Sequence, residues 1–143
     1  MILSEFWEAQ NLINNLYTRC TGSVCAKYDL TRMELDILLF LANNPQFDTA
    51  SDIVERRLLT KSHVSTSIKS LVERGYLARA YAPANRKTVH LSICPAAASI
   101  VADGRAAQEE FFSILFLGFT EADRQQLRRF FVQIADNVNR HSP

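Results

Sequence analysis

The segment that decides the fold is Leu59–Ile93, which reads LTKSHVSTSIKSLVERGYLARAYAPANRKTVHLSI. Its first half repeats apolar residues every three or four positions, as an amphipathic helix does. Thr60 is suited to cap the start of this helix, and Gly75 is suited to the left-handed position just beyond its end. After Gly75 the period changes to two, which is typical of strands. The segment therefore predicts a helix over residues 60–74 followed by a β-hairpin.

The two expected strands are connected by the six residues Ala82–Lys87, with the sequence APANRK. This connection is longer than the two-residue turns that close tight hairpins. We therefore expect a projecting loop whose basic tip is exposed. We call the hairpin the wing and Ala82–Lys87 the wing tip.

Positive charge is concentrated in this part of the chain. From Arg56 to His90 there are eight Lys or Arg residues and one acid, Glu73, so the net charge is +7. The whole chain has a net charge of +1, so the remaining residues sum to −6. A surface of one sign attracts the opposite sign, and phosphate backbones are the commonest such partner. Solvated cations that cluster by chance are the alternative.

The residues before this segment predict a helix-turn-helix. Thr31-Arg-Met-Glu34 has the form of a capping box, and the helix that follows, to about Asn43, is apolar on nearly all sides. Such a helix belongs in the middle of a core. Thr49 is placed to cap a short helix that ends near Arg57. Only three or four residues then separate this helix from the one that begins at Thr60, as in a helix-turn-helix.

Amphipathic helices flank this central part. We expect one from Ser4 to about Cys20, one from Pro95 to about Leu117, and a last one that begins at Thr120-Glu-Ala-Asp123. The expected fold class is mainly α with a small β-hairpin wing (α+β). We expect a single domain over 1–143, with a winged helix-turn-helix at 30–94 and helical dimerisation parts at 1–22 and 95–140.

Composition excludes several classes of protein. The longest apolar run, Ile37–Ala42, is too short to span a bilayer, and the opening MILSEFWEAQN lacks the basic start of a signal peptide. Three cysteines without metal-like spacing argue against a disulfide framework, so we expect a cytoplasmic protein. The sequence has no Gly-rich phosphate loop, nucleophile elbow or pair of catalytic carboxylates. We therefore expect no enzyme and no cofactor.

In their order and spacing, these motifs resemble the MarR family of bacterial transcription regulators over nearly the whole chain. The matching features are Leu30-Thr31, Thr60–Thr66 (TKSHVST) and Leu71–Arg79 (LVERGYLAR). The last of these is similar to the family's leucine-glutamate-x-glycine-leucine-x-x-arginine passage. The resemblance implies a homodimeric repressor that binds double-stranded DNA at a pseudo-palindromic operator. Helix 60–74 would lie in the major groove and the wing tip in the minor groove.

The wing tip departs from the family pattern. Family wings usually read Asp-Pro-x-Asp-Arg-Arg, whereas Ala82 and Asn85 stand here in place of the two acids. The arginine equivalent to Arg79 often has a wing carboxylate near it in relatives, and that partner is missing. We therefore expect a looser and more basic wing.

The candidate DNA-binding residues follow from the polar face of helix 60–74 and from the wing. The start of a helix favours phosphate oxygens, and a helix fits the major groove. By resemblance, the side chains that meet base edges are Ser62, His63, Ser65 and Thr66, and those that meet phosphates are Lys61 and Lys69. Local helix capping is an equally simple role for Ser62 and Thr66. Wing contacts are expected from Arg79, Asn85, Arg86 and Lys87, with Arg86 in the minor groove.

Some relatives sense zinc and others sense oxidants through a cysteine. His63, His90 and His141 lie too far apart in sequence to suggest a zinc site, and we expect His90 on the exposed face of the hairpin. Cys20 and Cys25 flank the expected end of the first helix. Structural packing is favoured for them over a redox-sensing thiol, which would need exposure and a lowered pKa.

Relatives bind small aromatic compounds in a crevice, which Trp7, Tyr17, Tyr28 and Phe111 could line, although aromatic residues at helical spacing more often form core.

The terminal helices carry more apolar surface than a winged helix can cover, including Phe130 and Phe131, and this predicts a homodimer. A winged-helix module that binds protein is the rival function, and the +7 segment argues against it.

Overall fold

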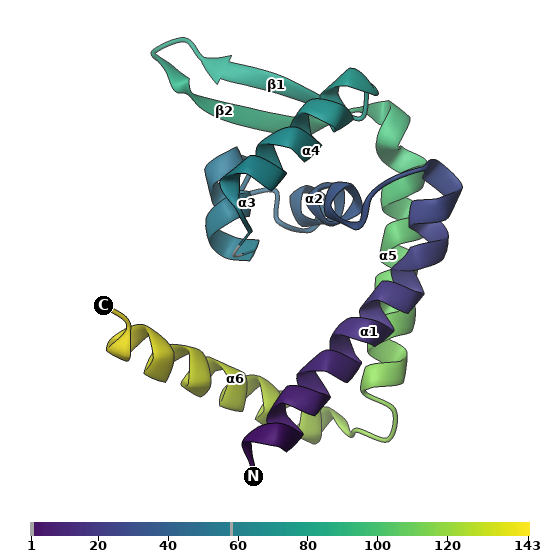
Figure 1. Ribbon diagram of the computed structural model, residues 1–143, viewed down its shortest axis with the longest axis vertical. Coiled ribbons are helices and arrows are strands. Elements are labelled where there is room, and N and C mark those ends of the chain that lie inside the picture. The colour runs from purple at the N-terminus through teal and green to yellow at the C-terminus, as the bar shows by residue number, and fades with distance from the viewer. Residues whose placement is uncertain (1, 58) are drawn as a thin grey trace. The chain divides into compact units, whose positions relative to one another are not determined.

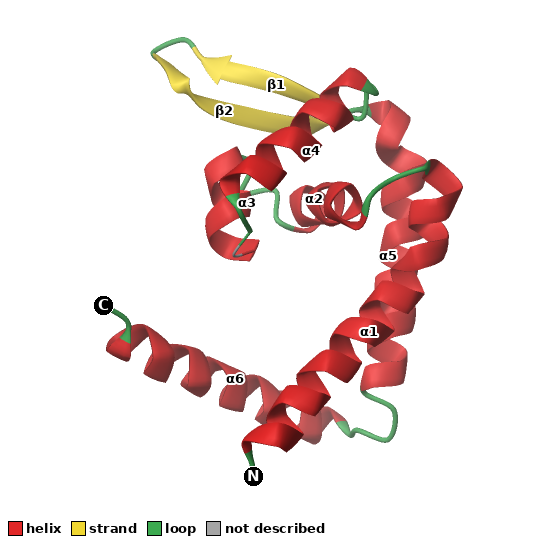
Figure 2. Ribbon diagram, viewed as in Figure 1, coloured by secondary structure: helices red, strands yellow, loops and turns green. Residues whose placement is uncertain are grey.

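The computed structural model describes residues 2–57 and 59–143, and leaves out Met1 and Leu58. The chain divides into two compact units, Met1–Phe111 and Phe112–Pro143, and each is considered by itself. The expectation of one domain over 1–143 therefore stays a prediction. The described part is mostly helical with one two-stranded antiparallel sheet, which confirms the expected fold class (Figures 1 and 2).

The core of the first unit is built around α2 (Arg32–Asn43). Thr31 and Glu34 form the expected capping box, and a run of side chains from Leu35 to Leu41 is buried except at Asp36, which is partly exposed. A helix that is apolar on most sides must be covered on most sides. The other helices and the wing of this unit supply that cover (Figure 1).

The helix-turn-helix consists of α3 (Ala50–Arg57) and α4 (Lys61–Glu73). Thr49 and Asp52 bond each other's backbone amides at the start of α3. Thr60 stands at the N-cap of α4, but its side chain accepts no cap hydrogen bond. Gly75 follows the end of α4 with a φ of 78°, as expected for the residue that ends the helix.

The wing differs from the expected long loop. Strands β1 (Leu77–Ala82) and β2 (Asn85–Ile93) leave only Pro83 and Ala84 between them, so the expectation of a loop too long for a two-residue turn is wrong. The extra residues lie in β2 instead, because the pairing passes from Tyr81↔Val89 directly to Ala82↔Asn85. Three residues of β2 therefore bulge out of the ladder near the tip.

The first helix is longer than its apolar spacing indicated. Helix α1 runs over Leu3–Tyr28 and passes through Gly22, so the expected end near Cys20 is wrong. It ends at Asp29, which takes the left-handed conformation with a φ of 51°. Asp is one of the few residues besides Gly that visit this region, so no glycine signals the helix end. Cys20 and Cys25 consequently lie within the helix and do not flank its end.

Helix α5 (Ala98–Leu115) lies beside α1 (Figure 1), and Tyr17 of α1 packs edge-to-face on Phe111 of α5. A single 3₁₀ turn, Pro95–Ala97, precedes the α-helix Ala98–Leu115, where the sequence predicted one continuous helix from Pro95 to Leu117. At Gly104, an added Cβ would lie 2.7 Å from Cδ2 of Leu39. Helices α5 and α2 therefore approach each other closely at a position that only glycine can occupy without displacing Leu39.

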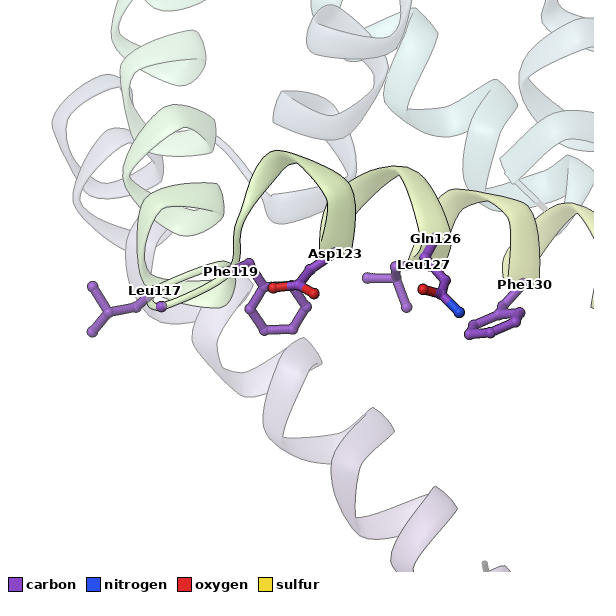
Figure 3. Close-up of a pocket in the computed structure, with 7 residues that line it drawn as sticks. Leu117, Phe119, Asp123, Gln126, Leu127 and Phe130 are labelled. Carbon is purple, nitrogen blue, oxygen red and sulfur yellow. The ribbon is translucent and has the colours of Figure 1, made fainter.

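The second unit contains the end of α5, a turn at Gly118 and α6 (Glu121–His141). Helix α6 begins where expected, and Thr120 and Asp123 form a capping box at its start. Large apolar side chains along α6 remain exposed, with Phe131 at 61% and Val138 at 59%. Leu127, Phe130 and Phe119 lie along one side of this helix, where they line an open groove of about 450 Å³ (Figure 3).

Candidate nucleic-acid interface

One face of α4 is buried and the opposite face is open. Val64, Ile68 and Leu71 are at most 4% exposed and pack into the core. The six candidate side chains of this helix are all exposed: Lys61, Ser62, His63, Ser65, Thr66 and Lys69. The exposed face carries two cations and no acid along these residues, so it is suited to a polyanion.

Thr66 makes a contact that limits its possible role. Its hydroxyl donates a 2.9 Å hydrogen bond to the carbonyl of Ser62, one helical turn earlier. The hydroxyl hydrogen is therefore used within the helix, while the methyl group and an oxygen lone pair remain available to a ligand. A contact from Thr66 to a base would be apolar, or would have the hydroxyl as acceptor.

A buried carboxylate of α2 bonds α4 to the core. Ser70 donates a 2.8 Å hydrogen bond to Oε2 of Glu34, and the amide of Thr31 donates to Oε1 at 2.9 Å. Glu34 is only 5% exposed. Burial by itself raises the pKa of this carboxyl, but the hydrogen bonds and nearby Arg74 outweigh burial and hold the pKa below its ordinary value.

The wing tip is organised by Asn85. Its side-chain oxygen accepts from the amide of Lys87 at 3.0 Å, and its side-chain nitrogen donates to the hydroxyl of Thr88 at 3.0 Å. These two bonds close the bulge of β2, which explains how a two-residue turn suffices. Asn85 and Lys87 are exposed. The side chain of Arg86 lies outside the described part of the structure.

Arg79 of β1 pairs with Leu91 of β2 and lies on the same face of the hairpin as Leu77. Both leucines are buried. Its own side chain is exposed. Among the described residues, no carboxylate pairs with it. This agrees with the loss of the wing acids, and it leaves the guanidinium available to an external anion.

The sequence predicted His90 on the exposed face of the hairpin, whereas the structure shows it partly exposed and in contact with Asp48. Its Nδ1 lies 3.0 Å from Oδ1 of Asp48, and its side chain is 42% exposed. Next to it, the amide of Leu91 donates to the carbonyl of Asp48 at 2.8 Å, and Thr49 forms an isolated bridge with His90. These contacts attach β2 to the start of α3, so the wing and the helix-turn-helix form one structure.

A small cavity lies behind the helix-turn-helix within the first unit. Its volume is about 120 Å³, and Tyr17, Asp36, Arg57 and Gln108 are among its lining residues. Oδ2 of Asp36 lies 3.5 Å from Arg57 and 3.7 Å from Arg32. Oδ1 is buried without a hydrogen-bond partner among the described residues. Burial raises the pKa of Asp36, and the two guanidinium groups offset this only in part.

Of the four aromatic residues considered for a ligand crevice, only Tyr17 lines this cavity. Trp7 is 51% exposed beside Phe6, Phe111 packs on Tyr17, and the hydroxyl of Tyr28 donates to Asp103 at 2.7 Å. The four therefore do not meet in one site.

The cysteines and histidines form no cluster that points to sensing. Cys20 is buried, and burial raises the pKa of Cys25, which is the opposite of what a reactive thiol needs. Over residues 2–57 and 59–143, no three His, Cys, Asp or Glu side chains gather as metal ligands would. In the same residues, no helix is both long and apolar enough to cross a bilayer.

A helix-turn-helix followed by a β-hairpin defines the winged-helix class of fold. Residues 28–87 match the model of the MarR family. No curated protein is significantly similar to this chain in sequence. Many solved structures resemble it in fold.

A MarR-family transcriptional regulator from Listeria monocytogenes in complex with a 26-mer DNA has 17% sequence identity and a TM-score of 0.79, covering 96% of this chain and 89% of that chain. MepR of S. aureus in complex with DNA has 14% identity and a TM-score of 0.76, covering 96% of both chains. MarR of Staphylococcus aureus with salicylate and kanamycin has 16% identity and a TM-score of 0.76, covering 97% of this chain and 93% of that chain.

Over residues 28–87 the chain thus matches the MarR family of transcription regulators, and the solved structures that resemble it have the same winged-helix fold. Members of this family are not enzymes, which confirms the expectation on that point. Sequence reasoning found the exposed face of α4 but missed the residues that orient it, Ser70 and Glu34. Glu34 was recognised only as a capping residue, and a serine on the partly buried side of a helix gives no signal of a long-range bond.

Proposed function

We propose that this protein is a homodimeric transcriptional repressor that binds a pseudo-palindromic operator. In this proposal α4 enters the major groove and the wing tip enters the adjacent minor groove. The observation that carries it is the open face of α4 over residues 61–69, which holds two cations and no acid, together with a wing whose Arg79 is unpaired among the described residues. Two chains of similar fold were solved in complex with DNA, which supports DNA as the partner.

The proposed contacts divide into two kinds. Lys61, Lys69, Arg79, Arg86 and Lys87 would neutralise phosphates, while Ser62, His63, Ser65 and Thr66 would lie against base edges, with Asn85 supporting the tip. None of the side chains on this face of α4 is a bidentate reader such as Arg to guanine or Asn to adenine. We therefore expect modest base discrimination, with groove shape supplying more of the specificity.

Dimerisation is proposed through α1, α5 and α6. The exposed apolar side chains of α6 are joined by those of α1, where Leu3 is 68% exposed and Leu12 is 68% exposed. Apolar surface of this extent on each unit seldom stays in water, and a two-fold partner would cover it. Two recognition helices related by a two-fold axis would then read half-sites about one helical turn apart.

Release by a small aromatic ligand is part of the proposal. The cavity at Tyr17 and Asp36 touches α1, α2, α3 and α5, so its occupation would be felt by the helix-turn-helix. Salicylate is bound in one similar structure. Because the expected ligand of the protein is chromosomal DNA, we place its action in the cytoplasm, and repression would follow from covering a promoter.

The experiment that tests the proposal is a titration of the protein with random-sequence and genomic duplex fragments at several salt concentrations. Five cations per subunit predict release of about 6–10 counterions by a dimer, so affinity should fall about a thousandfold or more between about 50 and 200 mM salt. A flat response would show that the basic segment is not the contact surface. Failure to bind duplex even at low salt would favour the protein-binding alternative.

A further inference from the structure

Arg74 is counted among the cations of the basic segment, but its side chain is occupied within the protein. It is the residue that follows α4, and its guanidinium donates from Nη1 to the carbonyl of Asp29 and from Nη2 to the carbonyl of Tyr28, both at 2.6 Å. The same group lies over the ring of Tyr76 at 5.2 Å. Its hydrogen-bonding edge is thus directed at the end of α1 and away from a ligand.

The two carbonyls that Arg74 binds are well suited to it. The last carbonyls of a helix lack partners within the helix and carry the negative end of its dipole. Asp29 adopts a left-handed conformation there, and the amides of Asp29 and Leu30 turn back onto Ala26 and Cys25. A planar guanidinium can bond two adjacent oxygens at once, whereas a lysine ammonium cannot reproduce that fork.

Tyr28 connects this contact to α5. Its hydroxyl donates to Oδ2 of Asp103 at 2.7 Å, and Lys27 binds the same oxygen at 2.9 Å. The end of α1 is therefore bonded on one side to α5 and on the other side to the end of α4. The Ser70–Glu34 bond holds the same helix to α2, so the C-terminal end of α4 is attached at Ser70 and, just beyond the helix, at Arg74.

From this geometry we propose that Arg74 is a positioning residue for DNA recognition. It sets the angle of α4 relative to α1 and α5, and thereby the separation of the two recognition helices in the dimer. It does not neutralise a phosphate. This inference rests on the proposed function above, because it assigns to one cation of the basic segment a role inside the protein.

The first test compares Arg74→Gln, Arg74→Lys and Lys69→Gln by binding to duplex DNA over a series of salt concentrations. Lys69 is the matched control, because it lies exposed on the same helix and is a proposed phosphate contact. We expect Lys69→Gln to reduce the slope of log K against log salt by about 1–2 for a dimer. Both Arg74 variants should leave that slope unchanged while lowering affinity for the selected operator at least tenfold.

The second test measures half-site separation. Wild-type protein and the variants are each used to select binders from a randomised duplex pool, and the spacing between the two enriched half-sites is counted. Wild type should enrich one spacing, whereas Arg74→Gln and Arg74→Lys should broaden it with unchanged half-site sequence. Hydrogen exchange at residues 27–30 should be faster in both variants, since the end of α1 loses its cap.

The outcomes separate the inference from the proposed function. If Arg74→Lys binds as tightly as wild type, or if Arg74→Gln reduces the salt slope as Lys69→Gln does, then Arg74 acts by its charge on DNA. If spacing and exchange at residues 27–30 are unchanged, Arg74 does not position α4. In each of these cases wild-type binding stands and only the inference is overturned. Absence of duplex binding by the wild type would overturn both.

Discussion

Ser70 of the proposed recognition helix and Glu34 of α2 are 36 residues apart in sequence and are joined by a 2.8 Å hydrogen bond. The carboxylate is buried and ionised, and its pKa is held below the ordinary value by the hydrogen bonds it accepts, although burial acts in the opposite direction. A buried charge of this kind is stable only while its donors stay in place. Glu34 therefore links the folding of the core to the placement of α4.

Glu34→Gln should lower the free energy of unfolding by about 1–3 kcal/mol at pH 7, because the amide cannot accept both hydrogen bonds. Since the folded-state pKa is lowered, the contribution of the carboxylate is present above the unfolded pKa of about 4.3 and is lost as pH falls through the folded value. Urea unfolding should therefore show the difference between variant and wild type shrinking on acidification. Glu73→Gln, at the exposed end of α4, is the control and should change stability by less than about 0.5 kcal/mol. A difference that does not depend on pH would contradict the assignment.

The pH dependence of stability at Asp36 should be opposite to that at Glu34. Burial raises its pKa, so the ionised form is disfavoured in the folded state and becomes more costly as pH rises through that value. We expect Asp36→Asn to leave stability unchanged or to increase it by up to about 1 kcal/mol at pH 7. This difference should vanish below the unfolded pKa of about 3.9, where both side chains are neutral. A clear loss of stability at pH 7 would show that the contacts to Arg57 and Arg32 outweigh the cost of burial.

Thr66→Ala and Arg86→Ala should alter DNA binding differently. Removing the methyl and hydroxyl of Thr66 should relax preference at one position per half-site, where a well-formed contact is worth about 1–3 kcal/mol of discrimination. Removing Arg86 should weaken binding most at sites with A·T-rich flanks, where the minor groove is narrow. Both variants are tested by selection from a randomised duplex pool. A uniform loss over all sequences would mean that α4 binds only the DNA backbone.

Thr66→Val refines this test. Valine keeps a methyl group and removes the hydroxyl, whose hydrogen already bonds the carbonyl of Ser62. If the base contact is apolar, Thr66→Val should retain the wild-type preference. If the hydroxyl oxygen accepts from a base, Thr66→Val should lose the preference as Thr66→Ala does.

Asn85→Asp restores an acid that the family pattern has at this position. The carboxylate can still accept from the amide of Lys87, so the bulge should persist, but a negative charge is added at the wing tip. We expect duplex affinity to fall several-fold at low salt and to approach the wild-type value at high salt, where charge is screened. Asn85→Ala, which loses both tip bonds without a new charge, should lower affinity with a weaker dependence on salt. Equal salt dependence in the two variants would contradict this.

Phe131→Glu should dissociate the proposed dimer. Phe131 is 61% exposed on α6, and a charge in an apolar interface is costly to bury. Light scattering should give about twice 16.2 kDa for wild type and a single chain mass for the variant at micromolar concentration. The control is Gln133→Glu, which adds the same charge on the polar side of α6 that also carries Arg129. If the wild-type protein is itself a monomer, the proposed dimer is wrong.

The elements that sequence reasoning predicted well are those with local signals. Thr31 with Glu34 and Thr120 with Asp123 begin their helices as expected, since each capping box is completed within four residues. Gly75 ends α4 as expected, because a glycine directly after a helix is also a local signal. Local chemistry is sufficient in these cases because both partners of each interaction lie in one short stretch.

The errors arose where a side chain took over a task usually given to glycine or to a loop. Asp29 ends α1 in a left-handed conformation without a glycine, and Asn85 closes the wing bulge, so a tight turn replaces the expected loop. The anchoring bonds of Ser70, Arg74 and Tyr28 span from 36 to 75 residues. Periodicity cannot reveal such pairs, because it reports only which face of a helix is buried.

Gly104 has a consequence for how this protein can change over generations. A single methyl group there would lie 2.7 Å from Leu39. The close spacing between α2 and α5 therefore depends on the absence of a side chain at this residue. Any replacement at this position must either turn Leu39 into another rotamer or push α2 outward. Substitution of Gly104 would thus change the proposed operator preference of a descendant protein without altering any residue proposed to contact DNA.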